Sequence, residues 1–362
     1  MSVPSSRLPD IETMSLQSYD LKFHIRAFCP SETRNPVKPV RGHRRSAASG
    51  RGGRSPSSVF SVSRFLLVLL HPSMMAQTLL LDGYNLTFRS FYAVPELTRS
   101  DGFPTNALHG WVKTVWRLND MYPDARIIAF FDLDGDRKRE ELLPDYKANR
   151  SEMPDELRKQ IPEIRKVTEL MGIRVVEQSG VEADDLIASA AKLIGESGGE
   201  AVIVSADKDM AQCIGGPVTQ LLPPPTANPR LGWRTLDESG VQEKFGVRPD
   251  QIADYLALVG DTSDNIPGLS GVGPKTASNW LRSYGTIEAI IQNSGRLKPP
   301  RFQTKVSEER ENLLRNQELT RLDRGHSVSL EAVSPQTSEL RAFLEEMEMK
   351  ATASEVEKRY GG

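Results

Sequence analysis

The sequence predicts an α/β protein with a parallel-rich central sheet flanked by helices, followed by a helical C-terminal region. Two observations carry this prediction. Between residues 76 and 220, short apolar runs alternate with amphipathic helical patterns, as expected for parallel strands connected by helices. Beyond residue 241 the patterns are those of helices alone. We therefore expect a first domain over residues 76–240 and a helical region over residues 241–362.

Residues 1–75 differ in composition from the rest of the chain. The stretch RGHRRSAASGRGGRSPSSVFSVSR is rich in Arg, Ser and Gly and has no helix or strand period, which predicts a disordered leader. The composition is also similar to that of an organelle transit peptide, although four acidic residues oppose this. A third interpretation, which we favour, is a start site assigned too early, with Met74 or Met75 as the real start.

The elements of the first domain follow from the periodicity. Three apolar runs have the length of buried strands, namely TLLLD (78–82), ARIIAFFD (125–132) and AVIVSAD (201–207). Helical patterns occupy residues 106–121, 155–171 and 183–196. The run LLPPPTANPR (221–230) predicts a surface loop, because it is rich in proline. A helix near 249–259 and a glycine-rich turn at 268–273 follow in the C-terminal region.

The composition limits the classes of protein that fit. The hydrophobic content of 38% and the charged content of 26% are typical of a globular protein, and no apolar run reaches the length of a membrane helix. The two cysteines, Cys29 and Cys213, exclude a disulfide framework. Residues 1–73 carry eleven Lys and Arg against four Asp and Glu, a net charge of +7. Because the whole chain carries −2, the remainder carries −9.

Aspartates follow all three predicted strands, at Asp82, Asp132 and Asp207. In open parallel sheets, ligands bind outside the carboxyl ends of the strands. These three side chains should therefore converge at one edge of the sheet. Further acids in the segments GVEADD, SADKD and GDTSDN can join them there: Glu182, Asp184, Asp185, Asp209, Asp261 and Asp264.

Carboxylates crowded in this way need protons, basic partners or cations. Histidine is absent from these segments, and Lys208 is the only basic residue inside them. An all-oxygen ligand set suits Mg²⁺ or Mn²⁺ rather than Zn²⁺. The number of acids predicts two ions, an arrangement that stabilises the attacking and leaving oxygens of a phosphoryl displacement.

Each acidic segment alone has a simpler structural explanation. An Asp at the end of a strand commonly caps a turn or a helix, and acids in the first turn of a helix interact favourably with its dipole. The occurrence of five such segments in one chain favours metal binding over these explanations.

The acidic segments, in this order, resemble the 5′ nuclease family, which includes the 5′–3′ exonuclease domain of bacterial DNA polymerase I and the flap endonucleases. The similarity runs from about Thr78 to near Tyr360 and includes LLLDGYNLTFRSFYA, FFDLDGDRKREELLPDYKANR, VSADKDMAQ and GDTSDNIPGLSGVGPKTA. With no polymerase domain after these motifs, the chain resembles a free-standing 5′ nuclease. The resemblance implies a PIN-like 5′ nuclease fold for the first domain.

The resemblance also assigns the metal ligands. It implies that the first ion is held by Asp82, Asp132, Glu182 and Asp184. It implies that the second ion, or its waters, is held by Asp185, Asp207, Asp209, Asp261 and Asp264. Of these, Asp185 and Asp261 are the least expected to bind metal directly.

The segment DRKREELLPDYKANR (136–150) is basic at both ends and follows the strand that ends at Asp132, so it should lie over the acids. In the family this segment is a helical arch or clamp, expected here at about residues 134–158. The resemblance implies phosphate contacts for Lys147, Arg150 and Arg89, which we expect to be catalytic. Tyr146 can stack on a base. The remaining basic residues of the arch, expected to bind DNA, are Arg137, Lys138 and Arg139. The alternatives are a solvated charged helix for the arch and a surface ion pair for Arg89.

The segment IPGLSGVGPKTASNWL (266–281) predicts a helix–hairpin–helix, expected within about residues 264–284. Its glycines permit tight turns and a close approach of the backbone to DNA, and the free N–H groups of the helix that begins near Pro274 can hold a phosphate. The residues expected to bind DNA are Gly268, Gly271, Gly273 and Lys275. The resemblance implies a K⁺ ion bound by hairpin carbonyls.

The predicted function is that of a metal-dependent, structure-specific 5′–3′ exonuclease and 5′ flap endonuclease. The resemblance implies substrates with single-strand/double-strand junctions, including flaps, nicks and RNA primers, and a role in replication and repair. We expect a monomer that binds no membrane, located in a bacterial cytoplasm unless the leader directs organellar import. The two rival functions are a PIN-like ribonuclease, which normally lacks the arch and hairpin, and a junction-binding module without activity, which the intact acid set opposes.

Overall fold

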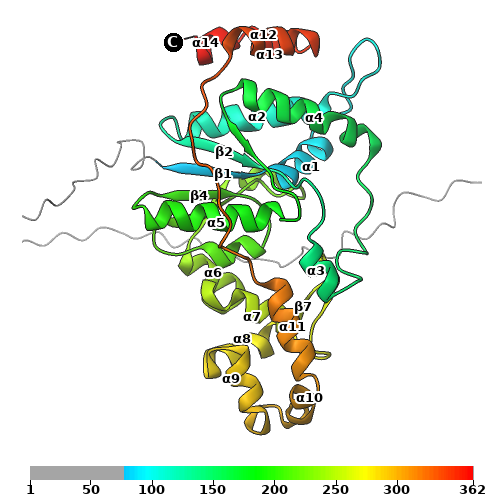
Figure 1. The fold of residues 1–362 in the computed structure, drawn as a ribbon, viewed down its shortest axis with the longest axis vertical. Helices are drawn as coiled ribbons and strands as arrows, with labels where there is room; N and C mark the ends of the chain where they lie inside the picture. Colours follow the sequence, from blue (N-terminus) through cyan, green and yellow to red (C-terminus); the bar gives the residue numbers. More distant parts are fainter. Residues whose placement is uncertain (1–76, 362) are drawn as a thin grey trace, which may run out of the picture. The chain divides into compact units, whose positions relative to one another are not determined.

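The computed structural model of the chain describes residues 77–361, so the leader predicted for residues 1–75 lies outside the described residues. A six-stranded sheet in the order β3-β2-β1-β4-β5-β6 forms the centre of the first domain (Figure 1). The strands are β1 (Thr78–Asp82), β2 (Arg126–Phe130), β3 (Arg174–Val176), β4 (Ala201–Val204), β5 (Val218–Leu222) and β6 (Arg234–Leu236). All neighbours pair in parallel except β5 and β6. The predicted fold class is confirmed.

Strand β1 lies in the middle of the sheet and is buried along its whole length. Side chains alternate between the two faces of a strand, so Leu79 and Leu81 belong to one apolar core while Leu80 belongs to the other. A strand covered on both faces needs an unbroken apolar run, and TLLLD supplies it. The carboxylate of Asp82 therefore stands at the end of a fully buried strand.

Helices cover both faces of this sheet (Figure 1). Leucines and isoleucines of α1 (Gly83–Ala93), α2 (Asn106–Met121) and α4 (Asp155–Leu170) join the core that contains Leu79. Helix α5 (Ala183–Glu196) packs on the opposite face, against Leu80. The predicted bounds of α2 and α5 match the structure residue for residue. Between β2 and α4 lies the short helix α3 (Arg137–Leu142).

The C-terminal region has an apolar core of its own. Its helices are α6 (Glu238–Phe245), α7 (Ile252–Val259), α8 (Pro274–Tyr284), α9 (Ile287–Gln292), α10 (Gln303–Glu308) and α11 (Arg310–Thr320). The hairpin between α7 and α8 contains two strands of two residues, β7 (Gly260–Asp261) and β8 (Ile266–Pro267). The region predicted as purely helical thus includes one small antiparallel pair.

The end of the chain returns to the first domain. After α11, residues 321–336 run without helix or strand along the sheet (Figure 1), and α12 (Thr337–Glu346), α13 (Lys350–Ala353) and α14 (Val356–Tyr360) follow. Leu340 and Phe343 of α12 and Val356 of α14 belong to the same core as Leu79. The predicted division at residue 241 is therefore incomplete, because α12–α14 pack with the first domain and not with α6–α11.

Three short strands escaped the sequence prediction. Strand β3 has three half-buried residues at one edge of the sheet, too few to establish a period. Strand β6 forms the other edge. Strand β5 contains Leu221 and Leu222, which the prediction assigned to a surface loop because the prolines that follow dominate the pattern. Within residues 77–361 no helix has both the length and the apolar character needed to cross a membrane.

Candidate active site

A first group of acids gathers where β1, β2 and the start of α5 meet. Asp82 caps α1 by accepting from the backbone N–H of Asn85 at 3.1 Å, and the hydroxyl of Ser205 donates to its other oxygen at 2.6 Å. Asp132 accepts from the backbone N–H of Ala183 at 2.7 Å. This bond connects the end of β2 to the first residue of α5, whose N-terminal end carries Glu182 and Asp184.

The charges in this first group affect one another strongly. Burial raises the pKa of Asp82 to about 7, and Asp207 and Asp132 add to the shift. Burial also raises the pKa of Asp184 well above its ordinary value, followed by the charges of Asp207, Asp82 and Asp132. The causes of both pKa shifts are burial and the charges of neighbouring carboxylates, as expected for acids at the carboxyl ends of adjacent strands.

A second group lies beside the first. Oxygens of Asp209, Asp261 and Asp264 all lie within 4.8 Å of one another. Burial raises the pKa of Asp209, and the charge of Asp207 is the next largest cause. The backbone N–H of Asp209 donates to a carboxylate oxygen of Asp207 at 2.8 Å, and the backbone N–H of Asp207 donates to the Ser205 hydroxyl that contacts Asp82, so Asp207 lies between the two groups. One carboxylate oxygen of Asp209, Oδ1, is buried and accepts no hydrogen bond. The amino group of Lys208 approaches it only to 3.8 Å.

Lys208 instead forms a close ion pair with Asp261 at 2.7 Å. Burial works to raise the pKa of Asp261, but Lys208 and Ser263 outweigh it and hold this pKa below its ordinary value. One lysine therefore neutralises one of the three acids. The unpartnered oxygen of Asp209 and the three carboxylates within 4.8 Å of one another fit a divalent cation bound by oxygen ligands.

Asp185 does not join either group. Its two oxygens accept from the guanidinium of Arg139 at 2.7 and 3.0 Å, and one also accepts from the backbone N–H of Asp323 at 2.8 Å. All its short contacts are thus on the side of α5 that faces α3 and residues 321–323. The predicted metal role of Asp185, the weaker part of the expectation, is not supported by this geometry.

Arg139 was expected to bind DNA, and the structure contradicts this. Its side chain is only 6% exposed. Besides Asp185, it contacts Asp136 at 2.6 Å and Glu182 at 3.3 Å, and it donates to the carbonyl of Leu319 at 3.1 Å. A buried guanidinium with five donors is stable only when acceptors surround it. Arg139 therefore ties α3 to α5 and to the end of α11, and it is not available to a phosphate.

Two other basic residues of the predicted arch do lie at the acids. Lys147 forms an ion pair with Glu182, and Arg150 forms one with Asp264 at 2.6 Å. Lys147 has a positive φ of 58°, and its backbone N–H donates to the carbonyl of Asp264 at 3.0 Å. The turn after α3 therefore crosses from one acidic group to the other. Arg137 and Lys138 are exposed on α3, where Lys138 pairs with Glu318 at 3.2 Å.

Tyr146 was predicted to stack on a base, and the structure does not support this. Its side chain is 8% exposed and packs with Ile266 and Leu319. Its hydroxyl donates toward Glu182 and Asp264, each at 3.3 Å. The ring therefore holds the turn against the acids.

Arg89 is half-buried on α1, and its guanidinium donates to the backbone carbonyl of Pro224. The burial lowers its pKa. Within the described residues it forms no ion pair, so the surface ion pair considered as an alternative is absent. Its predicted contact with a phosphate stays a prediction.

The glycines of the predicted hairpin have different environments. A side chain at Gly268 would collide with the backbone of Val259 at 2.2 Å, so this glycine permits close packing inside the protein. Gly271 has a φ of +84°, and Gly273 caps α8 with open space around it and no side-chain cap. Lys275 is exposed in the first turn of α8. Gly271, Gly273 and Lys275 thus remain accessible to a ligand.

Sequence reasoning missed two residues that position the acids, Ser205 and Ser263. The hydroxyl of Ser205 donates to Asp82, while it also accepts from the backbone N–H of Asp207 at 2.9 Å. The hydroxyl of Ser263 donates to Asp261 at 2.5 Å. Their signal in the sequence is weak, because it consists only of a serine two residues before Asp207 and a serine two residues after Asp261.

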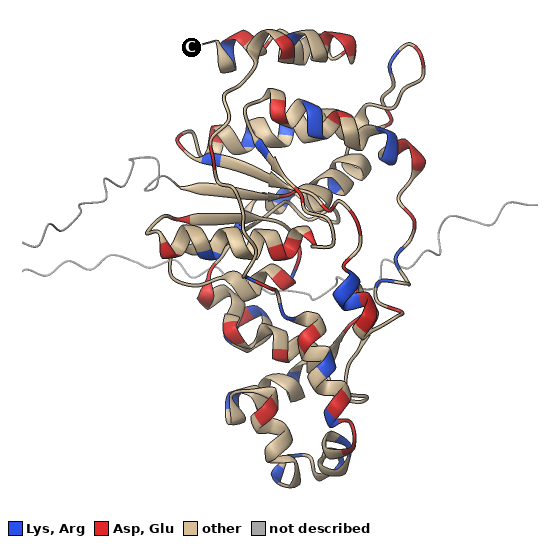
Figure 2. Cartoon of the chain, in the orientation of Figure 1, with Lys and Arg blue, Asp and Glu red and all other residues tan. Residues whose placement is uncertain are grey.

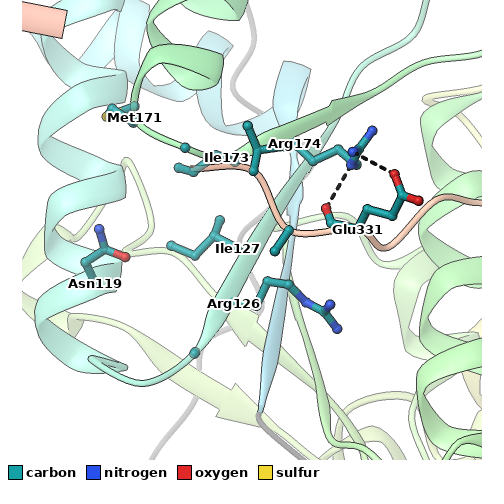
Figure 3. A pocket seen from close by; sticks show the side chains of 11 residues that line it. Asn119, Arg126, Ile127, Met171, Ile173, Arg174 and Glu331 are labelled. Carbon is teal, nitrogen blue, oxygen red and sulfur yellow. Dashed lines mark hydrogen bonds and ion pairs between the residues drawn. The ribbon is translucent and has the colours of Figure 1, made fainter. Parts of the chain in front are cut away.

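A cavity of about 220 Å³ lies elsewhere, at the amino ends of the strands. Figure 3 shows its walls, which include Arg126 at the start of β2 and Arg174 at the start of β3. Arg174 donates to the carbonyl of Glu331 at 2.9 Å and to its carboxylate at 3.3 Å. This contact attaches residues 321–336 to the sheet. The acids converge at the carboxyl ends instead, so the cavity is not their site.

The site thus contains two neighbouring groups of acids, and Lys147 and Arg150 form ion pairs with them. Such a combination of metal-binding acids and phosphate-binding cations is that of a phosphodiester hydrolase. Two family models match the chain. The model described as "5′-3′ exonuclease, N-terminal resolvase-like domain" matches residues 77–246, and the one described as "5′-3′ exonuclease, C-terminal SAM fold" matches residues 247–342. The chain belongs to the 5′–3′ exonuclease family, and it is a nuclease.

Individual proteins agree with this assignment. A 5′–3′ exonuclease of Aquifex aeolicus (strain VF5) is 37% identical over 285 residues, which cover 77% of this chain and 94% of that protein. The thermostable DNA polymerase I of Thermus aquaticus is 35% identical over 288 residues, 79% of this chain, but the match spans only 33% of the polymerase.

Solved structures share the fold. T5 5′-exonuclease with bound divalent metal ions (zinc) has a TM-score of 0.56 at 23% identity, covering 78% of this chain and 99% of that one. The catalytic core of Rad2 in complex with a DNA substrate has a TM-score of 0.54 at 14% identity, covering 78% of this chain and 92% of that one. At such identities the likeness concerns the fold alone.

The acidic groups predict a measurable effect of metal on stability. At a free Mg²⁺ concentration of about 100 times Kd, binding adds about 2.7 kcal/mol to the free energy of unfolding, or about 5 °C in melting temperature for a chain of this size. The variant Asp209→Asn removes a buried charge without a close partner. Its metal-free form should therefore melt above the metal-free wild type, while its Mg²⁺-induced shift should be smaller.

Differential scanning calorimetry with EDTA or with Mg²⁺ measures both quantities. Glu196→Gln, on the exposed end of α5, is the matched control, and its shift should equal that of the wild type. An Mg²⁺-induced shift in Asp209→Asn as large as in the wild type would count against a metal role for Asp209.

Proposed function

We propose that this nuclease is a structure-specific enzyme that cleaves DNA at 5′ flaps and other single-strand/double-strand junctions, and removes RNA primers, in replication and repair. The observation that carries the proposal is the position of Lys147 and Arg150, which lie on Glu182 and Asp264 at the two acidic groups. Two divalent ions, Mg²⁺ or Mn²⁺, bound by these acids would neutralise a phosphodiester and activate water toward it.

We assign each acid to one of the two ions according to its position. We assign Asp82, Asp132, Glu182 and Asp184 to one ion, and Asp209, Asp261 and Asp264 to the other, with Asp207 between them. Ser205 and Ser263 hold Asp82 and Asp261 in their orientations. The Arg139–Asp185 ion pair positions α5 relative to α3 and the end of α11, and neither residue touches the substrate in this proposal.

The basic residues supply the groups that bind phosphate. Lys147 and Arg150 bring positive charge to the edge at which negative charge develops during cleavage, which is where such charge accelerates a reaction most. Both residues are held in place before substrate arrives by their carboxylate partners, and Lys147 also by its backbone bond to Asp264. Arg89, Arg137 and Lys138 are assigned to phosphates further from the cut.

The hairpin is the second part of the proposed DNA surface. The N–H groups at the uncapped start of α8, with Gly271, Gly273 and Lys275 around them, are suited to hold one phosphate of the duplex. A K⁺ ion at the hairpin carbonyls belongs to the same proposal. We further propose that the enzyme acts as a monomer in the cytoplasm, with the nuclease domain formed by residues 76–240 together with α12–α14.

Cleavage of a 5′-flap DNA, measured in single turnover with Mg²⁺, Ca²⁺ or EDTA, tests this function. We expect cutting at the junction with Mg²⁺ only, because the longer and looser coordination of Ca²⁺ does not reproduce the geometry of two close ions. The matched substrates are the same duplex without a flap and a single-stranded RNA. Preferential cutting of the RNA would favour a ribonuclease, and binding without any cutting in Mg²⁺ would favour a module without activity.

A further inference from the structure

A basic segment follows α9 and extends into the first turn of α10, and it was not singled out by the sequence patterns. Residues 295–305, GRLKPPRFQTK, contain four basic residues and no acidic one. They include most of two short 3₁₀ turns, Ser294–Arg296 and Pro300–Phe302, and the first turn of α10. Figure 2 shows this stretch of Lys and Arg at the end of the C-terminal region opposite the sheet. We call residues 295–305 the basic segment.

Contacts with α8 and with the hairpin place the basic segment against the helix–hairpin–helix. The indole N–H of Trp280, on α8, donates to the carbonyl of Lys298 at 2.8 Å, and its ring meets Phe302 edge-on at 5.4 Å. A side chain at Gly271 would come within 3.5 Å of Phe302. The amino group of Lys305 donates to the carbonyl of Ser270, inside the hairpin, at 2.9 Å. The basic segment and the hairpin are thus one packed surface.

The charges on this surface are not neutralised by the protein. Among residues 77–361, the ion pairs within 4 Å include none that involves Lys275, Lys298, Arg301 or Lys305. Lys275, Lys298 and Arg301 are exposed, while Lys305 is half-buried. Other exposed basic side chains do have acidic partners, as Arg248 has Asp250 at 2.8 Å. A group of unpaired cations held by a packed aromatic pair has the character of an anion-binding surface.

We infer that the basic segment binds the phosphates of a DNA duplex next to the phosphate held by the start of α8. This inference rests on the proposed function and extends its DNA surface. Lys298 and Arg301 contact the backbone of the duplex arm, and Lys305 positions the hairpin through Ser270 while adding charge. Duplex DNA carries one negative charge per about 1.7 Å of its axis, so neighbouring cations on one surface meet neighbouring phosphates.

The inference predicts that DNA binding depends less on salt concentration when cations of the basic segment are removed. Each phosphate contact contributes about 0.9 to the slope of log K against log salt. The double variant Lys298→Ala/Arg301→Ala should therefore lower the magnitude of this slope by about 1.8 for the binding of a flap DNA with a long duplex arm, with Kd about tenfold weaker at low salt. Lys305→Met should lower the slope by about 0.9, and Lys305→Arg should restore it.

The length of the DNA duplex arm distinguishes binding by the basic segment from binding by the hairpin. With the duplex arm shortened to about 6 base pairs, roughly half a turn, the double variant and the wild type should bind alike. The matched controls are Lys192→Ala on α5 and Lys350→Ala on α13, which should leave the slope unchanged. Fluorescence anisotropy in Ca²⁺ gives Kd and slope, and circular dichroism checks that each variant is folded.

Cleavage at saturating DNA separates the two proposals. If the wild type cuts the flap and the folded double variant binds the long-arm flap DNA with a lower slope, the inference is supported. If the wild type cuts and the folded double variant binds with an unchanged slope on the long arm, the basic segment is only a solvated surface and the inference is wrong. If the wild type binds flap DNA but fails to cut in Mg²⁺, the proposed function fails, and the slope still decides the binding surface.

Discussion

A protein with Asn in place of Asp184 should cut a 5′-flap DNA at least about 10³-fold more slowly than the wild type in single turnover, a loss of roughly 4 kcal/mol in transition-state stabilisation. Burial raises the pKa of this carboxyl well above its ordinary value, and the charges of Asp207, Asp82 and Asp132 add to the shift. Asparagine keeps the size of the side chain but removes the negative charge that holds a divalent cation. Asp207→Asn should lose as much, because Asp207 lies between the two groups.

Binding must survive for this result to identify metal ligands. In Ca²⁺, both variants should bind the flap DNA about as tightly as the wild type, since phosphate affinity comes from the hairpin and the basic residues. Ser239→Ala, an exposed substitution on α6, should change neither rate nor affinity. If Asp184→Asn keeps a rate within tenfold of the wild type at saturating Mg²⁺, a difference below about 1.4 kcal/mol, the assignment of Asp184 is wrong.

The second large effect concerns the turn after α3. Lys147→Ala should lower the single-turnover rate at saturating DNA by at least tenfold, about 1.4 kcal/mol, and by up to about 10²–10³-fold if the charge acts fully on the transition state. The backbone conformation of Lys147, with its positive φ, is equally unusual for Lys and Ala, so the substitution adds no new strain there. Arg150→Ala should act in the same direction.

The structure suggests a competing explanation that the experiment must separate. Lys147 also neutralises Glu182, so its loss could act through the acids instead of the substrate. Lys147→Arg keeps the charge and should recover part of the rate, whereas the Mg²⁺ concentration for half-maximal rate should change little in Lys147→Ala. A wild-type rate in Lys147→Ala would make the ion pair purely structural. Lys192→Ala, exposed on α5, is the control for loss of a lysine.

The parts of the fold that the sequence predicted well are those in which one pattern dominates. Strand β1 is covered on both faces, and the unbroken leucines record this burial directly. Helices α2 and α5 each have an apolar side facing the sheet and a polar side, so their bounds were readable to the residue. The aspartates that follow β1, β2 and β4 then converge because parallel strands place their carboxyl ends at one edge.

The parts that escaped prediction depend on partners far away in the chain. In its local sequence Arg139 looks like an exposed cation. It is buried because its guanidinium donates to Asp185, 46 residues later, and to the carbonyl of Leu319, 180 residues later. Tyr146 is hidden for the same reason, by Ile266 and Leu319. Helix α12 has an apolar side formed by Leu340, Phe343 and Leu344, and nothing in its local sequence tells which core that side will join.

The return of α12–α14 to the first domain has a consequence for how the protein is made. Leu340, Phe343 and Val356 belong to the core that also holds Leu79, so that core lacks part of its apolar surface until the last helices have been synthesised. Domains form as units during synthesis. A growing chain that has not yet reached α12 therefore contains all six strands of the sheet, but the apolar side chains of α4 that contact α12 are still uncovered. The order of the elements along the chain thus makes the first domain wait for helices that are synthesised after the whole C-terminal region.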